Sequence, residues 1–577
     1  KLEATLGDMA SIVRTVEDSV LQLNTIYRKI LMITGRDPDP YRDYMLDVQI
    51  PQMLDVFEKQ SEILYDLVKQ MEKITGQRGS HTASLEKLAY QLKEIVKHPE
   101  SITSKKRFDA FKTNVGALGS WILEVNEQPL DIDYIVVASP EQKMPRADAS
   151  FLGKLIHNIK SFFYSFVEDY SFIGSAEGEG DTITVWMGGG RDQAQVVKSM
   201  IDDSFTPNTG IQVNLRLIDP NAVLLQAIVA GQGPDVALGI PKATPVNFAI
   251  RNAVEELTRF KEFDDTIKNF RESALTPYRF QKGLFALPET ETFNMLFYRK
   301  DILEELKIEI PHTGEDHYTL LPVLQKKHLE FALPDPTKTP GDVSFATFLY
   351  QYGGQFYKGD GIASDLDSEP SMKAFKMWAE FYSNYKLPKE YDLPSRFRRG
   401  EIPLAVSDFT LYNTLSVSAP EIRGLWDFAP IPGLKKDDGS IRRDTSSNSS
   451  ACIMIKRSEH KESAWEFMKW WTSKDAQVRF GREMESILGA SARHPSANKL
   501  ALAELPWPTR HYKSLMEQGQ WVAGIPEVPG GYFTPRHLDN AFRKVAFSGE
   551  NPRETLLDYI NYINEEITLK RQEFGLE

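Results

Sequence analysis

The chain has 577 residues, 41% of them hydrophobic and 26% charged, a balance too apolar for a disordered chain and too aperiodic for a fibrous one. Its 68 basic and 81 acidic residues give a formal net charge of −13, which repels phosphate backbones and argues against nucleic acid as a partner. The single cysteine, Cys452, excludes an internal disulfide and a cysteine-based zinc site, and no apolar run reaches the roughly 18–20 residues of a membrane helix.

Residues 1 to about 170 have the apolar spacing of amphipathic helices. We expect Gly76 to end the second helix, Ser84 to cap the third, and Pro99 to end it. Each helix has one apolar face to bury, so the helices are expected to pack as a bundle. The stretches with apolar residues every three or four positions are 9–30, 53–71, 85–95 and 108–125.

Two further elements are expected before this first region ends. Residues 132–137 are predicted to form an isolated strand, and residues 151–167 a final helix rich in aromatic side chains. The small, polar and glycine-rich run at 174–180 has the composition of a linker. We therefore expect an N-terminal helical domain over 1–172, a linker over 173–180, and a second domain over 181–577.

Beyond the linker the pattern changes to alternating strands and helices. Helices are expected over 193–205 and 221–230, between three buried strands. This alternation predicts a parallel sheet with right-handed crossovers. The expected strands are 183–187, 211–217 and 235–239.

Three short motifs each have a functional and a simpler structural interpretation. The glycines at 188–190 follow a strand and precede a helix, where an anion can bind, but they match neither a dinucleotide fingerprint nor a Walker A motif. His312 and His317 are five residues apart and do not share a helix face, so a loop is favoured over a metal site. Cys452 lies in an apolar strand and is interpreted as a small, unreactive core residue. We expect no metal ion, no cofactor and no catalytic residue.

Aromatic residues gather at the predicted strand ends and loops. Flat rings stack on the apolar faces of sugars, while Asp, Asn and Arg side chains reach the hydroxyl groups. For any single ring, core packing is the commoner role. The residues concerned are Trp186, Tyr352, Phe356, Phe409, Tyr412, Trp426, Trp521, Tyr532 and Phe533.

From about residue 181 to the end, six segments resemble, in order, the extracellular solute-binding proteins of ATP-binding-cassette (ABC) importers. The group they resemble includes maltodextrin-binding and other oligosaccharide-binding proteins. In one place the chain departs from the family pattern, because residues 311–316 lack the tryptophan of the usual P-x-T-W-D-D sequence. The helical first third resembles the longer solute-binding lipoproteins of Firmicutes-type bacteria. The six segments are the strand 183–187 with its glycine turn, 231–236 (G-x-x-P-D), 287–301, 397–406 (F-x-x-G-x-x-A-M), 426–433 (P-x-P-G) and 464–473.

This resemblance implies a fold class, α/β with two lobes joined by a hinge as in periplasmic binding proteins, preceded by an α-helical bundle. Lobe 1 is expected over about 181–295 and 440–495, and lobe 2 over about 296–439 and 496–577. The ligand would lie between the lobes, which close on it like a hinge. The positions that the family uses to line this cleft carry over to Trp186, Gly189, Arg191, Asp235, Glu289, Glu291, Asp408, Tyr412, Trp426 and Asn448.

The function implied is a receptor that captures a carbohydrate and delivers it to the permease subunits of an ABC importer. We expect a monomeric cell-surface lipoprotein of a Gram-positive-type bacterium, attached to the membrane only through a lipid anchor upstream of Lys1. Two alternatives stay open at this point. One is an extracellular glycoside hydrolase that pairs Glu289 or Glu291 with Asp408. The other is a receptor for a peptide, a polyamine or a metal–anion complex.

Overall fold

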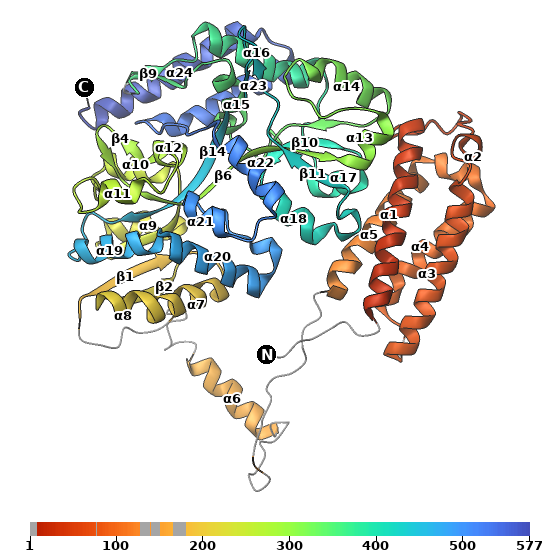
Figure 1. The fold of residues 1–577 in the computed structure, drawn as a ribbon, viewed down its shortest axis with the longest axis horizontal. Coiled ribbons are helices and arrows are strands. Elements are labelled where there is room, and N and C mark those ends of the chain that lie inside the picture. Colours follow the sequence, from red (N-terminus) through yellow and green to blue (C-terminus); the bar gives the residue numbers. More distant parts are fainter. Residues whose placement is uncertain are drawn as a thin grey trace.

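The computed structural model describes residues 9–76, 78–126, 139, 151–164, 173, 180–359 and 361–576. They form a helical bundle and an α/β body of two lobes, with helices on both faces of a mixed sheet (Figure 1). This architecture confirms the expected fold class. The strand expected at 132–137 and the run 174–179 lie outside the described residues.

The bundle consists of long helices whose apolar stripes face one another, α1 packing on α5 and α3 on α4. Gly76 ends α3 as expected, in the left-handed conformation (φ 71°), with its N–H donating to the carbonyl of Glu72. The expected cap at Ser84 is wrong, because the third long helix already begins at Ser80 and Ser84 lies inside it. The helices are α1 (Met9–Thr34), α2 (Leu46–Gln49), α3 (Met53–Thr75), α4 (Ser80–Lys97) and α5 (Lys105–Asn126), followed by the separate α6 (Phe151–Tyr164).

Lobe 1 is built on three parallel strands, with β1 between β2 and β3. Its helices bury one common apolar core against this sheet. The strands are β1 (Thr182–Met187), β2 (Gln212–Leu217) and β3 (Val236–Pro241), with the short hairpin β4 (Arg279–Phe280) and β5 (Gly283–Leu284). The helices are α7 (Arg191–Met200), α8 (Thr206–Thr209), α9 (Pro220–Val229), α10 (Thr244–Ile250), α11 (Phe263–Ile267), α12 (Glu272–Leu275), α19 (Lys461–Trp471) and α20 (Lys474–Leu488).

Lobe 2 extends the same sheet through β10, which pairs with β7 in parallel. Its strands are β7 (Phe331–Ala332), β10 (Leu404–Asp408), β11 (Trp426–Ala429) and β15 (Val522–Ala523), with the hairpins β8 (Tyr357–Lys358) and β9 (Ala363–Ser364), and β12 (Leu434–Lys435) and β13 (Ile441–Arg442). Its helices are α13 (Lys300–Leu306), α14 (Asp316–Lys326), α15 (Gly341–Gln351), α16 (Glu369–Ser383), α17 (Leu393–Arg399), α18 (Leu411–Ser418), α21 (Lys499–Glu504), α22 (Thr509–Gly519), α23 (Thr534–Ser548) and α24 (Pro552–Glu573).

Two long strands run from one lobe into the other. The first half of β6 (Leu287–Arg299) pairs with β14 (Thr445–Met454), and its second half pairs with β10 and β11 of lobe 2. Along its other edge β14 pairs with β3 of lobe 1 through Ser450–Met454, and its first two residues pair with β15 of lobe 2. These antiparallel crossings place the junction of the lobes at the middle of β6, where the functional site lies.

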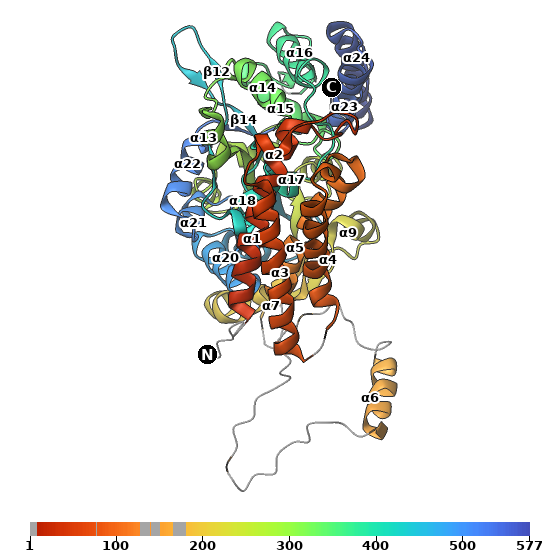
Figure 2. The same cartoon turned by 90° about the vertical axis from the view of Figure 1, so that its right-hand side faces the viewer.

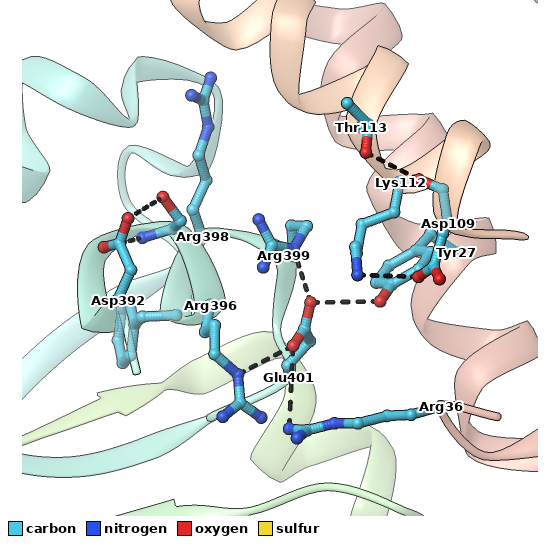
Figure 3. A network of polar contacts seen from close by, with 12 residues as sticks. Tyr27, Arg36, Asp109, Lys112, Thr113, Asp392, Arg396, Arg398, Arg399 and Glu401 are labelled. Carbon is cyan, nitrogen blue, oxygen red and sulfur yellow. Dashed lines mark hydrogen bonds and ion pairs between the residues drawn. The ribbon is translucent and has the colours of Figure 1, made fainter. Parts of the chain in front are cut away.

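The helical bundle is docked on lobe 2, and its apolar core continues into that lobe without a break. Figure 3 shows the polar contacts beside this core. The buried carboxylate of Glu401 accepts hydrogen bonds from the Tyr27 hydroxyl (3.2 Å), Arg396 Nε (2.9 Å) and Arg399 Nε (2.6 Å), and Arg36 lies 3.9 Å away. A buried carboxylate with this many donors is well compensated, so the contact fixes the bundle to lobe 2 in one orientation.

Candidate functional site: the cavity between the lobes

A cavity of about 690 Å³ lies at the junction of the lobes. Three of its charged side chains follow the carboxyl ends of strands: Lys242 comes after β3, Asp335 after β7, and Asp408 ends β10. This is the edge at which α/β sheets bind ligands. The crossing strands β6 and β14 form the floor. Its lining residues are Lys242, Thr292, Phe293, Asn294, Pro334, Asp335, Lys338, Thr339, Pro340, Val343, Tyr391, Asp392, Leu393, Pro394, Val406, Ser407, Asp408, Ser446 and Asn448.

Asp408 and Asn448 are the two expected cleft residues that the structure brings together in this cavity. The Asp408 carboxylate accepts a hydrogen bond from the backbone N–H of Thr410 (2.8 Å). Burial raises the pKa of Asp408, although hydrogen bonds from Thr292 and Thr410 oppose the shift. Asn448 is exposed on β14, so its amide offers both a donor and an acceptor to a ligand.

The lysines of the cavity are each close to a carboxylate. Lys242 Nζ lies 3.0 Å from Asp342 Oδ2, and the two side chains are only 11% and 5% exposed. Burial lowers the pKa of Lys242, but the charges of Asp342 and Glu527 outweigh this effect and leave the pKa above its ordinary value. Lys338, 62% exposed, lies 3.3 Å from Asp335. Hydroxyl, amide and charged groups thus converge on the cavity, with few aromatic rings.

The expected aromatic stacking residues lie elsewhere. Trp186 is 7% exposed within the lobe 1 core, and Trp426 is 9% exposed within an aromatic cluster of lobe 2. Tyr412 belongs to the same cluster, with its ring 5.4 Å from that of Trp426 and 5.3 Å from that of Trp507. These three residues therefore do not line the cavity, contrary to the expected cleft positions, because each packs into an apolar core of its own lobe.

The two glutamates of β6 are also outside the cavity. Glu289 accepts hydrogen bonds from the Gly239 N–H (2.6 Å) and from the Trp471 indole (2.5 Å), and burial raises its pKa to about 7. Glu291 is paired with Arg271 (2.9 Å); burial raises its pKa even though this arginine acts against the shift. Each carboxyl group satisfies buried donors within lobe 1, and neither lines the cavity in which the sequence placed it.

The remaining three expected residues belong to lobe 1 and do not line the cavity. Gly189 is exposed in the turn between β1 and α7, and Arg191 is exposed as the first residue of α7. Asp235 precedes β3 and accepts hydrogen bonds from the Thr184 N–H (2.7 Å) and the Ser458 hydroxyl (2.5 Å), which ties the entry of that strand to its neighbours. Its expected place in the cleft is corrected, because it lies at the amino end of β3 whereas the cavity is at the carboxyl end.

The sequence interpretation missed most of the lining residues. Lys242 had a usable signal, since it follows the predicted strand 235–239 within three residues, at the end that faces a ligand. Asp335 had none, because β7 is only two residues long and no alternation marks it. Thr292 and Asn294 lie within one long strand whose crossing point depends on its partners on both sides.

Within the described ranges, no group of three His, Cys, Asp or Glu side chains is arranged to hold a metal ion. Among the helices that the structure describes, none combines the length and apolarity needed to cross a membrane.

Two lobes joined by crossing strands, with a ligand-sized cavity at the junction, are the architecture of a hinged solute receptor. Residues 190–478, half of the chain, match the family model of bacterial extracellular solute-binding proteins, and the chain belongs to that family. Residues 11–118 match the four-helix bundle domain of bacterial solute-binding proteins. A Brucella abortus protein whose name calls it a binding protein is 23% identical over 288 residues, which cover 47% of this chain and 67% of that protein.

Solved structures show the same fold over the α/β body. The sugar-binding protein MalE of Xanthomonas citri superposes with a TM-score of 0.57 at 20% identity, covering 69% of this chain and all of that one. An extracellular solute-binding protein of Staphylococcus aureus, solved in complex with maltose, has a TM-score of 0.55 at 20% identity and covers 68% of this chain and 99% of its own. At these identities the likeness concerns the fold.

Proposed function

We propose that this protein captures a carbohydrate, in particular an oligosaccharide, in the cavity between its lobes and delivers it to an ABC importer without catalysing a reaction. The observation that carries the proposal is the cavity itself, about 690 Å³ in volume and lined from both lobes. This volume is within the range of small-ligand sites, and closure of the hinge would enclose the ligand. Several related folds were solved with sugars bound, such as maltotetraose in a cyclo/maltodextrin-binding protein.

The polar lining is suited to recognising hydroxyl groups. Asp408 accepts hydrogen bonds, and Asn448, Asn294 and Thr292 donate as well as accept them. Among the described residues that line the cavity there is no tryptophan, and the aromatic rings are those of Tyr391 and Phe293. We therefore propose that hydrogen bonds contribute more to affinity than stacking does.

We further propose the molecular setting that the family resemblance implies. The protein would act as a monomeric lipoprotein on the outer face of a Gram-positive-type cell and would dock on permease subunits after closure. The hydrolase alternative pairs Glu289 or Glu291 with Asp408. Of these three carboxylates only Asp408 lines the cavity, because Glu289 and Glu291 are held by buried partners outside it, so the required pair is not assembled there.

Calorimetric titration tests this proposal. The whole protein is titrated with maltose, maltotetraose and other neutral oligosaccharides, and with a peptide and a polyamine as competing ligand classes. Saturable binding of an intact sugar, with no release of reducing ends, is the expected result. Binding confined to the peptide or the polyamine, or hydrolysis of the sugar, would overturn it.

A further inference from the structure

Helix α6 (Phe151–Tyr164) lies between the bundle and β1 in the chain but apart from both in space, as Figures 1 and 2 show. Its described residues from Lys154 to Phe162 are all exposed. Four of them are large apolar side chains that are about half exposed: Leu155 (47%), Ile156 (53%), Ile159 (50%) and Phe162 (61%). Exposed apolar side chains gathered on one short helix commonly mark an interaction surface.

These four side chains share one face of α6. At 3.6 residues per turn they fall within an arc of about 120°, three and four residues apart in sequence. Lys154, His157 and Lys160 fall on the opposite face, within an arc of similar width. The helix is therefore divided into an apolar face and a basic one.

The net charge of α6 is opposite in sign to that of the chain as a whole. The helix contains two lysines and no aspartate or glutamate, whereas the chain as a whole carries a formal net charge of −13. A face of large apolar side chains opposite a polar face that carries lysines is the pattern of helices that lie in the plane of a lipid surface. The lysines attract anionic headgroups, and the apolar side chains enter the boundary between headgroups and acyl chains.

We propose that α6 is a membrane-surface helix, which binds anionic lipid bilayers through Leu155, Ile156, Ile159 and Phe162. This contact is additional to the lipid anchor expected from the sequence and does not depend on the ligand of the cavity. A second contact of this kind would hold this part of the receptor close to the membrane surface.

Vesicle binding of the whole protein tests the proposal. Sedimentation is measured with vesicles of phosphatidylcholine alone and with vesicles that also contain phosphatidylglycerol. We expect binding only to the anionic vesicles, weakening as salt is added. Ile159→Glu should lower the partition coefficient by at least about tenfold. Ser161→Glu introduces the same charge on the polar face and should lower it by less than about threefold.

Further variants separate the two parts of the contact. Replacing Lys154 and Lys160 together by Gln should reduce binding to anionic vesicles by about tenfold or more. Because α6 lies apart from the cores, all variants should melt at the wild-type temperature. Absence of binding to anionic vesicles, or equal losses in Ile159→Glu and Ser161→Glu, would overturn the proposal. So would a lipid-free dimer that Ile159→Glu abolishes, since a second copy would then be the occupant of this face.

Discussion

Lys242 and Asp342 form a buried ion pair between the two lobes, with Nζ 3.0 Å from Oδ2. Lys242 follows β3 in lobe 1, and Asp342 lies in the first turn of α15 in lobe 2, where a carboxylate is favoured by the helix dipole. The pair borders the cavity, because Lys242 is one of its lining residues. It also lies close to the buried carboxyl group of Glu527, so this one cation compensates more than one acid.

Replacement of Lys242 by Met is expected to destabilise the protein strongly. The change leaves Asp342 buried without its cation, which costs about 3–5 kcal/mol. At roughly 1–2 °C per kcal/mol for an α/β body of this size, the melting temperature should fall by about 3–10 °C. Lys338→Met is the matched control: this lysine also lines the cavity near an aspartate but is 62% exposed, so its loss should change stability by less than about 1 kcal/mol. Equal melting temperatures for the two variants in differential scanning calorimetry would contradict this account.

Stability should depend on pH through Glu527. Burial raises its pKa to about 7, against the opposing charge of Lys242 and with added repulsion from Asp342. The folded state therefore holds a proton that the unfolded state releases, so the free energy of unfolding should fall as the pH rises from about 4.5 to 7. Glu527→Gln should remove about 2–3 kcal/mol of this fall. Denaturant unfolding at several pH values measures it, with the exposed Glu565→Gln as the control whose slope stays that of the wild type.

Asn448→Ala should weaken sugar binding without affecting the fold. Its exposed amide would lose hydrogen bonds to the ligand worth about 1–3 kcal/mol, a loss of roughly 10- to 100-fold in affinity. Trp426→Ala should do the reverse, since removing a buried ring costs about 3–5 kcal/mol of stability. Ligand-free melting temperature and calorimetric affinity are measured for both. A large loss of affinity in Trp426→Ala with an unchanged melting temperature would instead show that Trp426 binds the ligand.

Removal of the helical bundle should lower stability more than affinity. None of the described residues of the bundle lines the cavity, so the fragment 177–577 should bind the ligand within a few-fold of the whole chain. Its melting temperature should fall, because the bundle and lobe 2 share one apolar core and Glu401 would lose Tyr27 and Arg36. Calorimetry and thermal melting are compared for both proteins. A hundredfold loss of affinity would show that the bundle helps to form the site.

Cys452 should be unreactive in the folded protein. Its side chain is fully buried in β14, its thiol donates to the Leu287 carbonyl (3.5 Å), and burial raises its pKa well above the ordinary value. A thiol reagent should label it only after denaturation. The variant Ser161→Cys adds an exposed thiol on α6 that should react at once, which shows that the reagent is active. Rapid labelling of the unmodified chain would contradict the buried position.

Local patterns in the sequence determined much of the fold. The spacing of apolar residues predicted α1, α3 and α5, Gly76 predicted where α3 ends, and the alternation of strands and helices predicted the parallel β1, β2 and β3. Such features depend on residues close together in the chain, so they can be predicted from a single sequence. Ser84 failed as a cap because a serine also occurs inside helices, and its own residue type does not distinguish the two positions.

The composition of the site was decided by tertiary structure. Asp408 and Asn448 were predicted and do line the cavity, but Lys242, Asp335 and Thr292 join them only because β6 and β14 cross between the lobes. Trp426, Glu289 and Asp235 are residue types that often bind sugars, but each contacts residues distant in the chain. Trp426 packs in an aromatic cluster, Glu289 accepts a hydrogen bond from the Trp471 indole, and Asp235 accepts one from the Ser458 hydroxyl. Whether a polar or aromatic side chain faces a ligand or a structural partner depends on which groups the fold brings within a few ångströms of it. The spacing of residues along the chain does not determine these distances in space.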